Sequence, residues 1–133
     1  MENKKYNVLV VDDHESIRNV AEIFLKHSYG ERVNTMSATN GEEAIDIARN
    51  QIHTNVLDLV LLDIRMPLMN GIEARNIIAE IYKKNNKKLP KIVAYSADCV
   101  NNARDRYLAH GFDDYIPKPS PFENFRSVVG RYI

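Results

Sequence analysis

Two short apolar runs, each followed directly by aspartate, restrict what this chain can fold into more than any other feature. Residues 8–11 read VLVV and precede Asp12 and Asp13, and residues 59–62 read LVLL and precede Asp63. An apolar run of this length is typical of a parallel strand that is buried on both faces. Parallel neighbours need long crossovers, usually helices, so the runs predict a chain that alternates strands with helices.

The rest of the chain continues this alternation. The predicted strands cover residues 6–11, 33–38, 58–62, 91–95 and 113–116. The predicted helices cover residues 15–27, 41–51, 71 to the polar stretch at 83–88, 100–109 and the segment from 121 onward. Strand–helix units without a linker predict one α/β domain over residues 1–133, with a doubly wound five-stranded parallel sheet between two helical layers. The units are too few for a closed eight-stranded barrel.

Capping residues mark several predicted helix ends. Asn40 and Glu43 have the spacing of a capping box. Ser120 is expected to be the N-cap of the last helix, with Pro121 at the first helical position. Gly111 is expected to end the fourth helix in the left-handed conformation.

Composition limits the possible partners and surroundings. Lys and Arg total 18 and Asp and Glu total 18, so the chain lacks the basic surface of a nucleic-acid-binding domain. No apolar stretch approaches the roughly 18 residues of a membrane span, and no apolar leader follows Met1. Cys99 is the only cysteine, which excludes a disulfide framework and a thiolate zinc site. We expect a cytoplasmic domain that binds neither nucleic acid nor a membrane.

Polar side chains follow four of the predicted strands. Asp12 and Asp13 follow the first strand, Asp63 the third, Ser96 the fourth and Lys118 the fifth. Open α/β sheets bind ligands at the carboxyl ends of their strands. Unpaired carboxylates about 4 Å apart would repel one another by roughly 4 kcal/mol at an effective dielectric constant near 20, so this edge calls for a cation. Oxygen ligands favour Mg²⁺, with Mn²⁺ as an alternative.

The same residue types suggest phosphoryl transfer. A carboxylate can form an aspartyl phosphate, which makes Asp63 the expected nucleophile. Lys118 offers a point charge for a phosphate group, and Ser96 offers a hydroxyl donor. A bound metal would neutralise charge in the transition state. A structural interpretation stays open for each residue alone, because Asp12 and Asp13 could cap a helix and Lys118 could pair with one of them.

Four segments together resemble a known family. They are residues 8–13 (VLVVDD), 61–71 (LLDIRMPLMNG), 93–97 (VAYSA) and 111–119 (GFDDYIPKP). With these segments the chain resembles a response-regulator receiver domain, the phosphoacceptor of two-component and phosphorelay signalling. The resemblance implies a flavodoxin-like sheet with strand order 2-1-3-4-5. It also implies a signalling domain, not a conventional enzyme, that accepts a phosphoryl group from a histidine kinase or a histidine phosphotransfer protein.

The resemblance implies a role for each residue of the metal site. Asp63 takes the phosphoryl group. Asp13, Asp63 and the backbone carbonyl of Arg65 are expected to bind Mg²⁺, and Asp12 is expected to hold a metal-bound water. The resemblance implies no organic cofactor.

The resemblance also assigns the groups that bind the phosphate and respond to it. Ser96 and Lys118 are expected to bind phosphoryl oxygens, and the Lys118–Pro119 peptide bond is expected to be cis. Tyr115 is expected to turn inward as Ser96 moves toward the phosphate, which makes both switch residues. This change would alter the surface formed by the fourth helix, the fifth strand and the last helix, where an unknown protein target would bind.

Two further side-chain hypotheses concern residues beside this site. Arg65 and Asp98 lie two residues after Asp63 and Ser96 respectively, so they could pair across the phosphate and slow its hydrolysis. His14 follows the acidic pair but has no ligand spacing with another histidine. An ordinary surface histidine is therefore the favoured interpretation of His14.

Several alternative functions can be compared with these motifs. A phosphohydrolase of the haloacid dehalogenase type needs an aspartate two residues after the nucleophile, where this chain has Arg65. A nucleotide-binding GxxxxGK[ST] loop is absent from the sequence. Residues 66–74 resemble hybrid histidine kinases, so a receiver from such a kinase remains an alternative to the free-standing form that a start at Met1 favours. A phosphorylation-independent adaptor is the other alternative.

Overall fold

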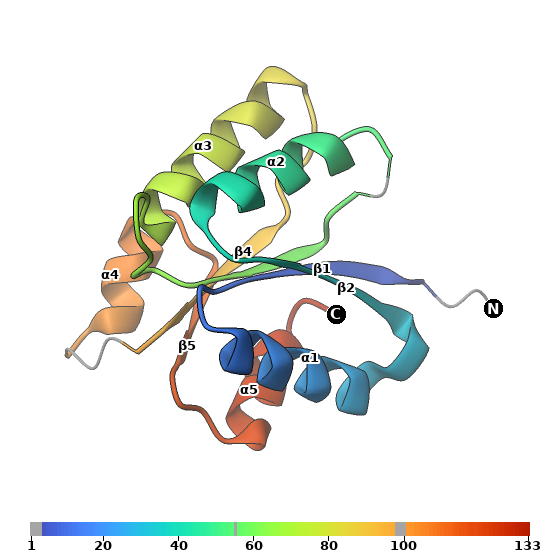
Figure 1. Ribbon diagram of the computed structural model, residues 1–133, viewed down its shortest axis with the longest axis vertical. Coiled ribbons are helices and arrows are strands. Elements are labelled where there is room, and N and C mark those ends of the chain that lie inside the picture. The colour runs from blue at the N-terminus through green and yellow to red at the C-terminus, as the bar shows by residue number, and fades with distance from the viewer. Residues whose placement is uncertain (1–3, 55, 98–100) are drawn as a thin grey trace.

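The protein alternates strands and helices along its whole described length. The computed structural model describes residues 4–54, 56–97 and 101–133 (Figure 1). The strands are β1 (Tyr6–Val11), β2 (Val33–Ala38), β3 (Leu59–Leu62), β4 (Lys91–Ser96) and β5 (Asp114–Pro117). The helices are α1 (Glu15–Tyr29), the short 3-10 helix η1 (Gly30–Arg32), α2 (Gly41–Gln51), α3 (Gly71–Lys84), α4 (Ala103–Ala109) and α5 (Phe122–Val129). Their boundaries lie within two residues of the predicted ones, except at α4, which begins at Ala103, three residues after its predicted start.

The sheet has the predicted topology. Its strands follow the order β2-β1-β3-β4-β5, and each neighbouring pair is parallel (Figure 1). This flavodoxin-like order places β1 and β3 side by side at the centre, with the chain winding outward in both directions. Among the described helices, none combines the length and apolar character that a membrane crossing requires.

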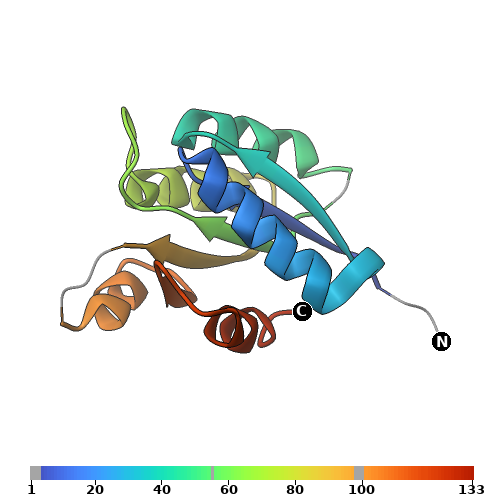
Figure 2. The same cartoon turned by 60° about the horizontal axis from the view of Figure 1, so that its bottom comes forward.

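Alternating residues of the central strands supply two separate cores. Leu9 and Val11 of β1 belong to the cluster that contains the buried residues of α2, α3 and α4. Val8 and Val10 belong to the cluster formed with α1 and α5. Figures 1 and 2 show α1 and α5 together on one face of the sheet, with α2 and α3 on the other. Burial on both faces explains why β3 and residues 8–11 of β1 are apolar throughout.

Asparagine caps begin α2 and α3. The side chain of Asn40 accepts a hydrogen bond from the Glu43 N–H at 2.8 Å, which confirms the predicted N-cap of α2. The Glu43 carboxylate reaches the N–H of Thr39 at 3.1 Å, so it does not close the predicted box on Asn40. A complete capping box occurs instead at α3, between Asn70 and Glu73.

The predicted start of α5 is wrong. Ser120 does not cap this helix, because its hydroxyl donates to the carbonyl of Pro117 at the end of β5. The helix begins at Phe122, with Pro121 in the N-cap position and no side-chain cap. This hydrogen bond holds the Ser120 side chain against the end of β5, and its oxygen accepts no hydrogen bond from the helix amides. The local sequence pattern does not reveal such a contact.

The predicted C-terminal stop of α4 is confirmed. Gly111 has a φ of 98°, and its N–H donates to the carbonyl of Leu108 at 3.0 Å. The N–H of Phe112 donates to the carbonyl of Tyr107 at 3.1 Å, completing a Schellman motif. The predicted start at residue 100 lies outside the described residues, but residues 101 and 102, also predicted to be helical, form a turn before α4 begins at Ala103.

Candidate functional site

Strand register brings the predicted site residues to one edge of the sheet. Val11 of β1 pairs with Leu62 of β3, so the aspartates that follow these two residues emerge side by side. The N–H of Asp63 donates to the carbonyl of Val11 at 2.9 Å. On the other side, the N–H of Lys118 donates to the carbonyl of Ser96 at 2.8 Å. Parallel pairing therefore gathers groups that are far apart in the sequence.

The site contains more buried negative than positive charge. Asp12 and Asp63 are 0% and 4% exposed, and Ser96 and Lys118 are also buried. The Lys118 Nζ lies 2.5 Å from Asp12 Oδ2 and 3.3 Å from Asp63 Oδ1, so one ammonium serves two carboxylates. Asp13 adds a third carboxylate that is more exposed. Such an excess of buried charge is costly unless a cation or a proton compensates it.

The pKa of Asp63 reflects this imbalance. Burial is the largest cause and raises the pKa of Asp63 from 3.8 to about 6. The charge of Lys118 lowers the pKa, and the neighbouring carboxylate of Asp12 raises it again. The negative charge of Asp63 is thus only partly compensated by Lys118, and such a shifted pKa at the carboxyl edge of a sheet is typical of a functional group.

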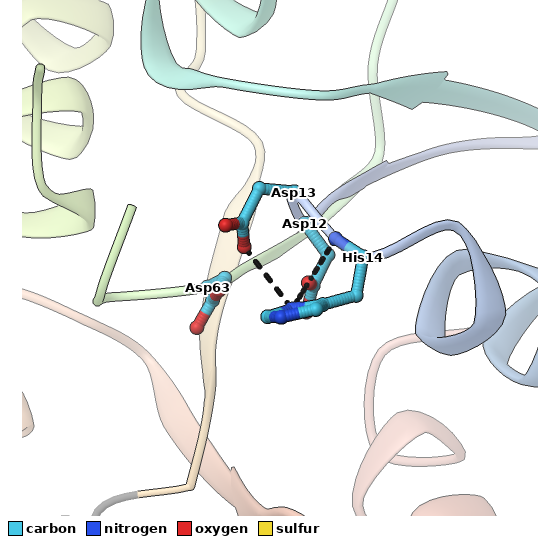
Figure 3. Close-up of side chains that lie close together, drawn as sticks. All are labelled: Asp12, Asp13, His14 and Asp63. Atoms are coloured by element: carbon cyan, nitrogen blue, oxygen red, sulfur yellow. Dashed lines mark hydrogen bonds and ion pairs between the residues drawn. The ribbon is translucent and has the colours of Figure 1, made fainter. Parts of the chain in front are cut away.

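His14 joins the acidic cluster, contrary to the favoured interpretation of it as an ordinary surface histidine. Its Nδ1 lies 3.1 Å from Asp12 Oδ1 and 3.2 Å from Asp13 Oδ1 (Figure 3). Its backbone N–H also donates to Asp12 Oδ1 at 2.9 Å. The sequence signal for this contact is the position of His14 directly after two strand-end aspartates, and no second histidine at ligand spacing is needed for it.

The donor set suits a divalent cation. Asp12, Asp13, His14 and Asp63 each offer one ligand atom, and these atoms all lie within 4.8 Å of one another. Figure 3 shows the four side chains converging from the ends of β1 and β3. Arg65 lies in the loop after β3 and lines a cavity next to these residues. Metal binding by its backbone carbonyl remains a prediction. Asp98, its hypothetical ion-pair partner, lies outside the described residues.

A cavity of about 530 Å³ opens beside the buried charges. Asp63, Ser96 and Lys118 line one part of it, and Ile17 and Val20 of α1 line another. A reacting group that enters this cavity meets the Asp63 carboxylate and the Lys118 ammonium together. Because the side chains that α1 contributes are apolar, a group that enters the cavity would lose contact with water.

Gly71 positions the loop that carries Asp63. Its N–H donates to the carbonyl of Ile64 at 2.8 Å. A Cβ atom at this position would lie 2.2 Å from the backbone oxygen of Asp63. Only glycine therefore allows the start of α3 to approach the backbone of the acidic residue so closely.

Tyr115 and the cis bond complete the predicted set. The Lys118–Pro119 peptide bond is cis, as the resemblance implies. Tyr115 is half-buried, and its ring centre lies 5.6 Å from that of Tyr107 in α4. This contact joins β5 to α4, although the movement expected of Tyr115 and Ser96 stays a prediction.

The strand order and the acidic cluster at the carboxyl edge of the sheet define a doubly wound α/β domain whose ligand site lies at the strand ends. Residues 8–130 match the family described as the response regulator receiver domain, and the chain belongs to this family. It is therefore a receiver domain of two-component signalling.

Relatives and solved structures agree with this assignment. The chain is 33% identical over 129 residues to the hybrid signal transduction histidine kinase G of Dictyostelium discoideum, covering 97% of this chain and 4% of the kinase. It is 25% identical to a chain in the Saccharomyces cerevisiae complex of the phosphotransfer protein Ypd1 with the receiver domain of Ssk1, with a TM-score of 0.82 and coverage of 99% and 91%. The Vibrio cholerae chemotaxis protein CheY4 shares the fold, at 22% identity, a TM-score of 0.78 and coverage of 97% and 99%. The chain thus spans a small fraction of the kinase that it matches.

Proposed function

We propose that Asp63 accepts a phosphoryl group from a phosphohistidine and that this modification switches a binding surface. The observation that carries the proposal is the buried Asp63 carboxylate, which faces a cavity and lies 3.3 Å from the Lys118 ammonium. A nucleophile and a cation at this spacing can hold a phosphoryl group between them. Family membership supports phosphoryl acceptance, and the strand-end geometry supports Asp63 as the acceptor.

In the proposed step, one Asp63 carboxylate oxygen attacks the phosphorus of the donor phosphohistidine. A P–O bond forms as the P–N bond breaks, and the electron pair of that bond leaves with the donor imidazole nitrogen. Lys118 neutralises charge on the phosphoryl oxygens, and the Ser96 hydroxyl donates a hydrogen bond to one of them. Asp63 must be ionised to attack, so its raised pKa makes a compensating cation useful.

Mg²⁺ is the cation that we propose for this site. When bound, Mg²⁺ would offset the negative charge of the carboxylates and of the transferring group. Asp13, Asp63 and the backbone carbonyl of Arg65 would hold it, and Asp12 would bind through a water molecule. The oxygen donors among the four clustered ligand residues fit this hard ion.

The donor is expected to dock against α1. Val20 and Ile23 on this helix are 42% and 64% exposed, although both are apolar. Val20 also lines the cavity that leads to Asp63, so a helical protein that presents a phosphohistidine can cover this apolar surface while its imidazole enters the cavity. The likeness to a receiver domain crystallised with a histidine phosphotransfer protein supports such a partner.

The output surface is expected on α4, β5 and α5. Tyr115 already contacts α4 through Tyr107, so a displacement of Tyr115 toward Ser96 would change the packing between β5 and α4. To reverse a strongly biased equilibrium, the phosphoryl group must favour the switched state by about 5 kcal/mol. An unidentified protein target would distinguish the two states at this surface.

The first test is intact-protein mass spectrometry after incubation with acetyl phosphate and Mg²⁺. We expect one added phosphoryl group on the wild type and on Asp46→Asn, which replaces an exposed carboxylate of α2. Asp63→Asn, or omission of Mg²⁺, should abolish the adduct. If no adduct forms although beryllofluoride binds, fast hydrolysis accounts for the result. If neither is observed, the chain acts as a phosphorylation-independent adaptor.

The docking surface is tested separately with a histidine phosphotransfer protein that phosphorylates the wild type. We expect Ile23→Asp to slow this transfer about tenfold, equivalent to ~1.4 kcal/mol, without changing the rate with acetyl phosphate. Ile77→Asp on α3 is the matched control, because Ile77 is also exposed. Equal slowing by both variants would contradict docking at α1.

A receiver segment of a hybrid histidine kinase is the second candidate. It is favoured by the identity to the Dictyostelium discoideum hybrid kinase, of which the chain covers 4%. Immunoblotting of source cells decides between the two forms. A band near 15.3 kDa supports the free-standing receiver, and a much larger band supports the hybrid kinase.

A further inference from the structure

His14 places a nitrogen donor among the oxygen ligands of the acidic site. Its Nδ1 lies 3.1 Å from Asp12 Oδ1 and 3.2 Å from Asp13 Oδ1. The ligand atoms of these three residues and of Asp63 all lie within 4.8 Å of one another. No other histidine contributes to a cluster of this kind within the part of the chain that the structure describes.

The separation of His14 Nδ1 from Asp13 Oδ1 is that of two ligands that share one ion. Two donors that each lie about 2.1 Å from a six-coordinate ion, at right angles to each other, are about 3 Å apart. The Nδ1 of His14 therefore has the distance of an adjacent ligand from Asp13 Oδ1, and it lies within hydrogen-bonding distance of Asp12 Oδ1. His14 is also the N-cap residue of α1, directly after the two aspartates, so its short backbone link keeps the imidazole beside them.

We propose that His14 is a metal ligand that raises the affinity of the site for Mn²⁺ and related transition-metal ions without raising its affinity for Mg²⁺. Mg²⁺ binds oxygen and rarely accepts imidazole, whereas first-row transition ions accept nitrogen and oxygen together. An all-oxygen site has no such preference for nitrogen-accepting ions. This inference rests on the proposed metal site and adds His14 as the residue that distinguishes between metal ions.

A second arrangement explains the same contacts without a metal. A protonated imidazole can form an ion pair with both carboxylates, and an exposed pair contributes only about 0–1 kcal/mol. The side chain of His14 is 64% exposed, so such a pair would leave metal binding almost independent of His14. Metal selectivity distinguishes the two arrangements.

The decisive measurement is pulsed electron paramagnetic resonance of the full chain with Mn²⁺, at a pH above the range in which imidazole protonates. Coordinated imidazole nitrogen produces a characteristic modulation of the Mn²⁺ echo. We expect this modulation in the wild type and in His53→Ala, whose substituted residue is exposed. His14→Ala should lose the modulation while still binding Mn²⁺ through the carboxylates.

Affinities measured on the same variants complete the test. We expect His14→Ala to weaken Mn²⁺ binding about tenfold, as the loss of metal-supporting groups typically does. Mg²⁺ affinity, measured by competition with Mn²⁺, should change little. Mn²⁺ binding without nitrogen modulation in the wild type would overturn the role of His14 and leave the proposed phosphoacceptor site intact. Absence of Mn²⁺ and Mg²⁺ binding would overturn both.

Discussion

Replacing Asp63 by asparagine should stabilise the metal-free protein at neutral pH. Burial raises the pKa of Asp63 from 3.8 to about 6, and each pKa unit corresponds to about 1.4 kcal/mol. Ionising Asp63 therefore costs the folded protein about 3 kcal/mol relative to the unfolded chain. Asparagine has nearly the same shape and no charge, and its amide oxygen can still accept a hydrogen bond from Lys118.

The sign of the pH dependence follows from proton binding. Between about pH 4 and pH 6 the folded protein holds a proton on Asp63 that the unfolded chain has lost, so the stability of the wild type falls as pH rises through this range. The stabilising contribution of protonated Asp63 is complete below about pH 4 and is lost above about pH 6. The advantage of Asp63→Asn should consequently be large at neutral pH and small near pH 4.

Urea denaturation with a chelator present measures this difference. We expect the free energy of unfolding of Asp63→Asn to exceed that of the wild type by up to about 3 kcal/mol at neutral pH. Mg²⁺ should raise the stability of the wild type more than that of the variant, because ligand binding to the folded state is stabilising. Asp46→Asn, at an exposed position, should behave as the wild type does. A destabilised Asp63→Asn at neutral pH, or a gain of equal size near pH 4, would refute the electrostatic reasoning.

Three further substitutions test the supporting structure by urea denaturation. Gly71→Ala forces a Cβ to 2.2 Å from a backbone oxygen and should lower the free energy of unfolding by about 3 kcal/mol. Gly41→Ala meets only a flexible methionine side chain and should lower it less. Equal losses in the two variants would contradict this reasoning. Asn70→Ala removes the capping box of α3 and should cost about 1 kcal/mol, so an unchanged stability would show that the cap is dispensable. Burial alone would raise the pKa of Asp114, but hydrogen bonds from its surroundings, including the Tyr132 hydroxyl, lower it. Tyr132→Phe should therefore lower the free energy of unfolding by about 1–2 kcal/mol at neutral pH. This loss should shrink as pH falls through the range in which Asp114 protonates. A loss that does not change with pH would indicate a packing effect.

The strands and the acidic edge were predictable because both depend on local sequence. The apolar residues before Asp12 and Asp63 identify strands that are buried on both faces, and parallel pairing then requires their carboxyl ends to meet. The position of Lys118 follows from the same parallel pairing, because Lys118 comes directly after β5 and lies beside Ser96 at the end of β4. The order of the strands came from the family resemblance, because strand periodicity alone does not state which strands are neighbours.

Side-chain direction accounts for what the sequence pattern missed. Ser120 has the residue type and spacing of an N-cap, but its hydroxyl donates a hydrogen bond to the carbonyl of Pro117 and does not cap the helix. His14 has no second histidine at ligand spacing, yet its ring turns back to the aspartates before it. Gly71 was expected only to start a helix, whereas it also contacts the backbone of Asp63. Each of these depends on tertiary contacts that residue spacing does not contain.

If Asp63 is phosphorylated as proposed, the charge balance of the site would allow Lys118 to link phosphorylation to switching. Lys118 is shared between Asp12 and Asp63, with its shorter contact to Asp12. Phosphorylation of Asp63 would replace a single carboxylate charge by a group that carries nearly two negative charges and three acceptor oxygens. The ammonium then has a stronger partner on the Asp63 side, and the Ser96 hydroxyl has a new acceptor. Because Lys118 and Ser96 lie at adjacent strand ends, a shift of both toward the phosphate would move the ends of β4 and β5 together. The proposed switch at α4, β5 and α5 would require such a displacement.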